Sequence, residues 1–278
     1  MNAAPMNAAP TNPAPTNPDA PDVATGVPLE VHLTTIRRAA RSLAEHLGVT
    51  GPGRPVPTCP EWTMRDLVLH AGEVHRWALH HVTNGSGAAV SIPPPAAPDD
   101  QDLGAWLVRG ADQLVDALAK ASDDLDALVF LKNAPAPRSF WARRQAHETL
   151  IHSIDGLSGR LGRIPTTREA DVPPALAVDG LDELLTGFIT RSRSQLRAQV
   201  PHRVVVAPTD ARVAWTLTLS PEPPVAARSA TPDDRSTLIT GTAASLYLGL
   251  WNRGDEVAVT GEPELLGIWR DKVRVSWA

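Results

Sequence analysis

The chain has 278 residues, of which 42% are hydrophobic and 21% charged, and its formal net charge is -5. This length exceeds the common single-domain size, so two domains are expected, and the charge provides no broad basic surface for nucleic acid. No apolar run approaches the roughly 20 residues that span a bilayer, and the N-terminus lacks the features of a signal peptide. A cytoplasmic protein without membrane contact is therefore expected. The single cysteine, Cys59, excludes an internal disulfide and a cysteine-cluster zinc site.

The first 26 residues repeat an Asn/Ala/Pro pentapeptide (MNAAPMNAAPTNPAPTNPDAPDVATG) and contain few residues that could form a core. This composition is typical of disordered segments. We therefore predict that residues 1–26 are a disordered leader.

Residues 27–160 carry four segments with apolar residues at helical spacing. The first helix is expected over 28–48 and the second over 64–82, after a Gly/Pro-rich loop at 51–60. Thr63 and Asp66 stand at the capping-box offset before the second helix. The third and fourth helices are expected at 103–120 and from 138 to about Gly156 or Gly159. Together they predict a four-helix bundle, a fold that often holds metal ions between facing helices.

Residues 175–278 have a different character, which predicts a small α+β domain. The segment 175–199 is expected to be helical. Short runs rich in β-branched residues and bounded by turn residues then predict strands. The expected strands are 203–207, 213–219, 225–229, 236–240 and 256–259, and the expected later helices are 242–251 and 263–273.

Glu148 and His152 stand four residues apart in the fourth helix, so a carboxylate and an imidazole lie on one face. This pair fits a metal site, but the same spacing is also common in solvated surface pairs. A metal site needs a third ligand from elsewhere. His70 lies beside the apolar stripe of the second helix, so its side chain can reach inward.

Four stretches resemble the mycothiol-dependent maleylpyruvate isomerase family. They are VPTCPEWTMRDLVLHAGEVHRW at 56–77, FWARRQAHETLIHSID at 140–155, GTAASLYLGLWNR at 241–253 and VTGEPELL at 259–266. The resemblance covers nearly everything after the leader. It implies a DinB-like four-helix bundle followed by a sterol-carrier-protein-like α+β domain.

The resemblance also implies that His70, Glu148 and His152 bind a divalent metal. Two imidazoles and a carboxylate suit Zn²⁺ and leave a fourth position for water or a thiolate. The implied thiol cofactor is mycothiol, the small thiol of actinobacteria. In an isomerase of this kind the metal-bound thiolate adds to a conjugated cis alkene, rotation follows, and elimination gives the trans alkene. In a thiol S-transferase the thiolate attacks a small electrophile and stays attached.

Two further residues are assigned catalytic roles with alternatives beside them. Asp155, about one turn beyond His152, is placed to orient a ligand imidazole, or it is an exposed acid at the helix end. Arg253 is the position expected to bind a substrate carboxylate, or it is a surface arginine.

A second function remains open, that of a non-catalytic metal-binding regulator or scaffold in which zinc only ties helices together. Such a closed site needs a fourth protein ligand, for which His147, Cys59 and Asp155 are the candidates. For an enzyme, the expected partners are a small-molecule substrate and a low-molecular-weight thiol, in a monomer or homodimer. The sequence does not specify the substrate.

Overall fold

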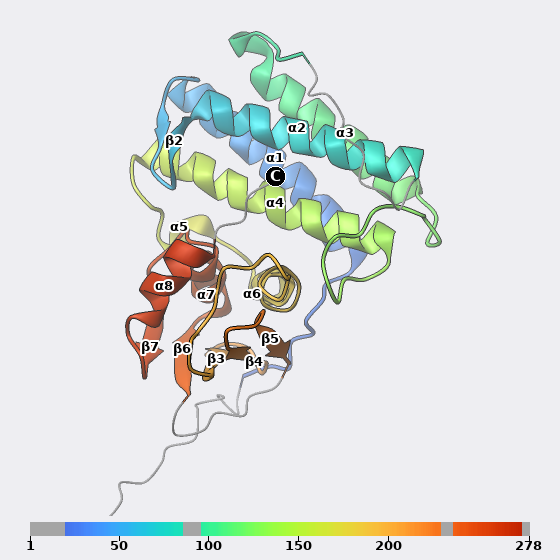
Figure 1. The fold of residues 1–278 in the computed structure, drawn as a ribbon. Coiled ribbons are helices and arrows are strands. Elements are labelled where there is room, and N and C mark those ends of the chain that lie inside the picture. The colour runs from blue at the N-terminus through green and yellow to red at the C-terminus, as the bar shows by residue number, and fades with distance from the viewer. Residues whose placement is uncertain (1–19, 86–95, 229–235, 274–278) are drawn as a thin grey trace, which may run out of the picture.

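The computed structural model describes residues 20–85, 96–228 and 236–273. Four long helices form a bundle (Figure 1). They pack through apolar stripes, and α1, for example, buries Ile36, Leu43 and Leu47. The bundle helices are α1 (Leu29–Thr50), α2 (Met64–Asn84), α3 (Leu103–Lys120, preceded by the 3-10 turn η1, Asp100–Asp102) and α4 (Pro137–Leu161).

The predicted start of α2 is confirmed, because Thr63 and Asp66 form a complete capping box. The first helix runs further than expected and ends at Gly51, which has a φ of 77°. The segment expected to be a loop at 51–60 instead contains a small hairpin. Its strands are β1 (Pro55–Val56) and β2 (Cys59–Thr63), paired antiparallel. The hairpin was missed because its strands have only two and five residues and both contain proline, so they show no clear alternating pattern.

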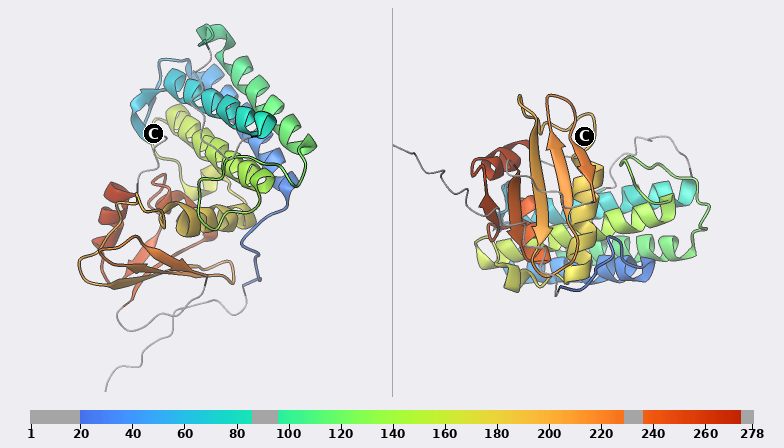
Figure 2. Two further views of the ribbon diagram at one scale, coloured as in Figure 1. Left: turned by 45° about the vertical axis from the view of Figure 1, so that its right-hand side comes forward. Right: turned by 90° about the horizontal axis from the view of Figure 1, so that it is seen from below.

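Helix α4 differs from the other bundle helices in burying many polar side chains along its middle, including Arg143, Arg144, His147 and Glu148. It lies between the rest of the bundle and the second half of the chain (Figure 2). Its polar residues therefore meet partners on both sides instead of water.

The second half is a five-stranded sheet with helices α6 and α7 between it and the bundle (Figure 1). The strand order is β5-β4-β3-β6-β7; β3 and β6 are parallel and the other pairs antiparallel. The strands are β3 (His202–Pro208), β4 (Trp215–Leu219), β5 (Val225–Ala227), β6 (Thr237–Gly241) and β7 (Ala258–Thr260). The helices are α5 (Thr167–Ala170), α6 (Pro174–Asp182), α7 (Ala243–Leu250) and α8 (Leu265–Lys272). A bundle followed by an α+β unit is the fold class expected from the sequence.

The helix expected over 175–199 was predicted too long. Helix α6 passes into a π-helical turn, η2 (Glu183–Phe188), and regular helix ends there. The Thr186 and Thr190 hydroxyls donate to backbone carbonyls four residues earlier, at 2.7 Å in both cases. Such bonds weaken the helical ladder.

Of the leader expected over 1–26, residues 1–19 lie outside the described residues. Residues 20–26 contact the protein: the Ala20 carbonyl accepts from Arg212 Nε at 3.1 Å, and Ala20 is 3% exposed. Among the described residues, no helix combines the length and apolarity that crossing a membrane requires.

Candidate metal site

The predicted ligands His70, Glu148 and His152 meet between α2 and α4, and we call them the open cluster. Glu148 Oε1 lies 3.4 Å from His70 Nε2 and 3.1 Å from His152 Nε2. The His70 side chain is 23% exposed and the other two are nearly buried. The structure therefore brings together three residues that the sequence places up to 82 positions apart (His70 to His152).

The donor set of the open cluster fits Zn²⁺. Ligand atoms about 2.0–2.1 Å from a tetrahedral zinc ion lie about 3.3 Å from one another. The two separations from Glu148 Oε1, 3.4 and 3.1 Å, bracket that value. Two imidazoles and a carboxylate are also a common set for a zinc ion that keeps one coordination position for a non-protein ligand.

The second oxygen of Glu148 is held by a buried arginine. Arg144 Nη2 donates to Glu148 Oε2 at 3.0 Å, and Arg144 Nη1 donates to Glu183 in η2. Burial opposes the charged form of Glu148, but bonds from His152 and His70 and the charges of His152 and Arg144 hold its pKa well below the usual value. Glu148 is thus a carboxylate whose other oxygen, Oε1, faces the two histidines.

Asp155 contacts His152, the second predicted ligand on α4. It is completely buried and is therefore not an exposed acid at a helix end. Its Oδ2 lies 3.0 Å from His152 Nδ1, and Arg253 donates to both of its oxygens at 2.9 and 3.0 Å. Burial disfavours the charged form of His152, yet bonds to Asp155 and Glu148 raise its pKa to about 9. Asp155 therefore orients the imidazole so that Nε2 points at Glu148.

Arg253 comes from the α+β unit, immediately after α7, and is only partly exposed at the side chain (19%). Besides Asp155, it donates to the Trp251 carbonyl at 2.9 Å and to Cys59 Sγ at 3.4 Å. Burial and the charge of Asp155 raise the pKa of the Cys59 thiol to about 12, although Arg253 opposes this. The thiol of Cys59 is therefore protonated near neutral pH.

A cavity of about 780 Å³ opens beside the open cluster. Its walls combine metal-type ligands, aromatic side chains and two arginines. It is lined by Thr58, Cys59, Pro60, Glu61, Trp62, His70, Glu148, Ile151, His152, Leu250, Trp251, Asn252, Arg253, Arg270 and Val273. A small molecule can therefore approach the open cluster from both the bundle and the α+β unit.

The candidates for a fourth protein ligand all point elsewhere. Cys59 contacts Arg253, Asp155 bonds the far nitrogen of His152, and His147 bonds Asp179. Within the described ranges, the metal-type grouping at this place contains three residues, His70, Glu148 and His152.

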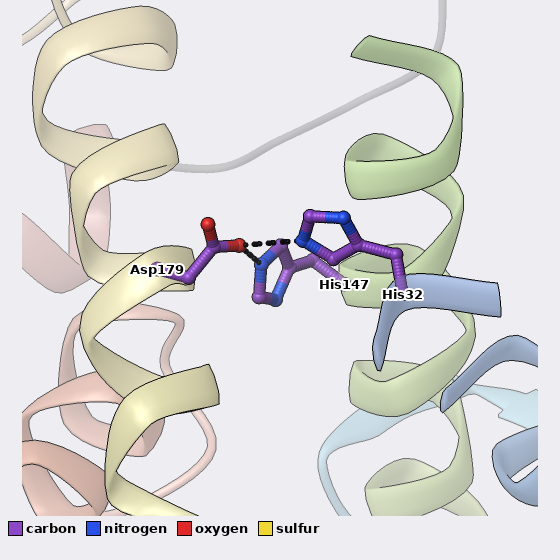
Figure 3. A group of neighbouring side chains, drawn as sticks. All are labelled: His32, His147 and Asp179. Carbon is purple, nitrogen blue, oxygen red and sulfur yellow. Dashed lines mark hydrogen bonds and ion pairs between the residues drawn. The ribbon is translucent and has the colours of Figure 1, made fainter. Parts of the chain in front are cut away.

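A second grouping, His32, His147 and Asp179, was missed from the sequence, and we call it the enclosed cluster (Figure 3). Asp179 Oδ2 lies 2.6 Å from His147 Nε2 and 3.0 Å from His32 Nε2. Burial lowers the pKa of His147 despite its bond to Asp179. In the sequence His147 is only a candidate fourth ligand of the open cluster, and it points about 100° away from Glu148 around the helix.

A helical bundle that carries a two-histidine, one-carboxylate site against an α+β unit defines the class of the protein. Residues 33–155 match the family model described as the mycothiol maleylpyruvate isomerase N-terminal domain, and residues 175–267 match the model of the C-terminal domain of the same family. The chain belongs to this family.

Solved structures agree with the fold. The chain is similar to a crystal structure of the mycothiol-dependent maleylpyruvate isomerase, with 18% identity and a TM-score of 0.57 over 85% of this chain and 95% of that one. It is similarly related to a histidine-to-alanine mutant of that isomerase, with 18% identity, the same coverage and a TM-score of 0.55. A comparison with curated proteins gave no match.

Proposed function

We propose that the protein is a zinc-dependent enzyme that uses a low-molecular-weight thiol, mycothiol, to isomerise or conjugate a small electrophilic substrate. The observation that carries this proposal is the open cluster: three protein ligands face a cavity of about 780 Å³. A closed structural site would need a fourth protein ligand, and the three candidates for it are engaged elsewhere.

Residues of this chain would bind the metal ion and orient its ligands. His70, Glu148 and His152 would hold the zinc ion, which when bound supplies the positive charge that keeps a thiol deprotonated near neutral pH. Arg144 and Asp155 fix the orientations of Glu148 and His152. The Trp62 ring packs beside the cluster, with its centroid 4.9 Å from that of His70 and 6.0 Å from that of His152.

Arg253 and Arg270 are the cationic groups of the cavity wall, and they suit a substrate that carries a carboxylate. Arg253 already donates two bonds to Asp155, so a substrate carboxylate bound there would share its guanidinium. Arg270, in α8, is exposed. The metal-binding regulator remains the alternative, and a cavity with two arginines beside the ligands favours the enzyme.

The test is turnover by the zinc-loaded protein with mycothiol and maleylpyruvate, followed by product analysis. A trans isomer without net thiol consumption identifies an isomerase, and a stable thioether with an alternative electrophile identifies a transferase. His152→Ala should abolish the reaction and most zinc binding at the open cluster, because two ligands hold the ion weakly. Zinc binding that is unchanged in His152→Ala would contradict the site, and wild-type protein that binds zinc but no thiol would favour the regulator.

A further inference from the structure

The enclosed cluster combines the same donor types as the open cluster but is not part of it. His32 comes from α1, His147 from α4 and Asp179 from α6, and all three point to one place (Figure 3). Their exposed fractions are 4%, 0% and 0%. One potential ligand atom from each lies within 4.8 Å of the other two.

We propose that the enclosed cluster is a second divalent-cation site, suited to Zn²⁺, that ties the bundle to the α+β unit. Two imidazole nitrogens and one carboxylate oxygen are a zinc-type donor set. Because the ligands come from three elements, an ion bound there would stabilise their packing, as structural metal ions do.

The surrounding contacts orient these side chains for an ion. His147 Nδ1 lies 3.1 Å from the Tyr247 hydroxyl, so when Nε2 binds a metal, Nδ1 carries the proton and donates it to that hydroxyl oxygen. Asp179 Oδ1 accepts from the Val27 backbone at 3.3 Å, which leaves Oδ2 facing the histidines.

An ion requires a small local expansion. The separations of 2.6 and 3.0 Å from Asp179 Oδ2 are hydrogen-bond lengths, so the ligands must part by less than about 1 Å to reach the roughly 3.3 Å of a tetrahedral zinc site. Arg143 Nε also donates to this oxygen at 3.2 Å. Its Nη2 donates to Asp182 at 3.2 Å, so the guanidinium keeps a carboxylate partner when a cation takes Asp179 Oδ2.

A cavity of about 410 Å³ lies beside the enclosed cluster, and His32 and Asp179 form part of its wall. It offers a route for a hydrated ion and room for a water molecule as the fourth ligand. Its other charged wall residues are Arg143, Asp182 and Arg228, and Asp182 pairs with both arginines.

The test is a titration of metal-free full-length protein with Zn²⁺, with metal analysis after gel filtration. We expect about two zinc ions per chain in wild type, about one in His152→Ala, about one in His32→Ala and none in the double variant. Circular dichroism checks that each variant is folded. If His32→Ala does not fold, Asp179→Asn replaces it as the ligand deletion of similar shape.

A folded His152→Ala variant that binds no zinc would overturn the proposal and identify the enclosed cluster as a hydrogen-bonded network only. Zinc that remains in the double variant would also overturn it, because the ion would then lie elsewhere. If the wild type binds a single zinc ion that is lost in His32→Ala and kept in His152→Ala, the result would support the enclosed site and contradict zinc binding at the open cluster. The titration therefore separates failure of this proposal from failure of the proposed enzyme.

Discussion

The open and enclosed clusters share helix α4, which gives consecutive residues to the two sites. Arg144 and Glu148 face the open cluster, whereas Arg143 and His147, one residue earlier in each case, face the enclosed one. Each cluster pairs two imidazoles with one carboxylate, and each carboxylate accepts a bond from one of these arginines. The clusters differ in access: one adjoins a cavity of about 780 Å³ with a partly exposed histidine, and the other is almost wholly buried.

This difference shows that donor chemistry alone does not decide what a metal-type cluster does. Catalytic zinc sites keep a position open to substrate or solvent, and structural sites are closed. Both clusters have three protein donors, so they differ in access and not in ligand number. The open cluster adjoins the larger cavity, about 780 Å³, and suits chemistry, whereas the donors of the enclosed cluster are at most 4% exposed and come from three elements, which suits stability. The following changes test the two assignments.

The largest expected effect concerns Arg144, which is completely buried and bridges Glu148 and Glu183. Arg144→Met removes the arginine that bridges two buried carboxylates, so we expect a loss of about 3–5 kcal/mol in the free energy of unfolding of the metal-free protein. Urea denaturation of the wild type and the variant measures this change in the free energy of unfolding. The control is Arg163→Met, which removes an exposed pair with Glu169 and should change the unfolding midpoint little. Equal effects of the two variants would contradict the bridging role.

A smaller effect is expected for Asp155, which supports the open cluster alone. Asp155→Asn keeps the shape but weakens the orientation of His152, so zinc affinity there should fall about 10–100-fold. Competition with a chelator measures this affinity in a His32→Ala background, where only the open cluster binds. The control is Asp112→Asn, which removes a surface partner of Arg37. Unchanged affinity in Asp155→Asn would show that His152 needs no support.

The last of these predictions concerns Cys59, which belongs to neither cluster and whose pKa is raised to about 12. An acid with a raised pKa stays protonated in the folded protein, so at pH 8 the thiolate fraction should be roughly a thousandfold lower than in the unfolded chain. The rate of modification by a disulfide reagent should rise about tenfold per pH unit from 7 to 10 without a plateau. A plateau near pH 8.5 would show an ordinary thiol and make Cys59 a possible metal ligand.

Much of the bundle was predictable from the sequence, because amphipathic spacing and local caps such as Thr63 and Asp66 specify helices. The α+β unit was recognised from its β-branched runs. The hairpin at Pro55–Thr63 and the early end of α6 were missed, since both depend on local backbone bonds that leave no periodic signal.

The two clusters differ in how far the sequence predicted them. Glu148 and His152 stand out by their spacing, and the family resemblance supplied His70. The enclosed cluster has no such signal, because His32 and Asp179 are 147 residues apart and only the docking of α6 against the bundle brings them together. The sequence did not show that His147 pairs with Asp179, because helical periodicity alone cannot position α6 against α4.

The most direct test of the central claim, that the open cluster keeps a coordination position for an external thiol, uses cobalt-substituted protein and a small thiol. We expect a sulfur-to-metal charge-transfer band only after the thiol is added. The same band is expected in Cys59→Ser, because the sulfur belongs to the added thiol, and in His32→Ala, because the cobalt ion that binds the thiol is held by the open cluster. His152→Ala should lose the band even if cobalt remains at the enclosed cluster. A band present before thiol is added and lost in Cys59→Ser, or no band at any thiol concentration, would contradict the account.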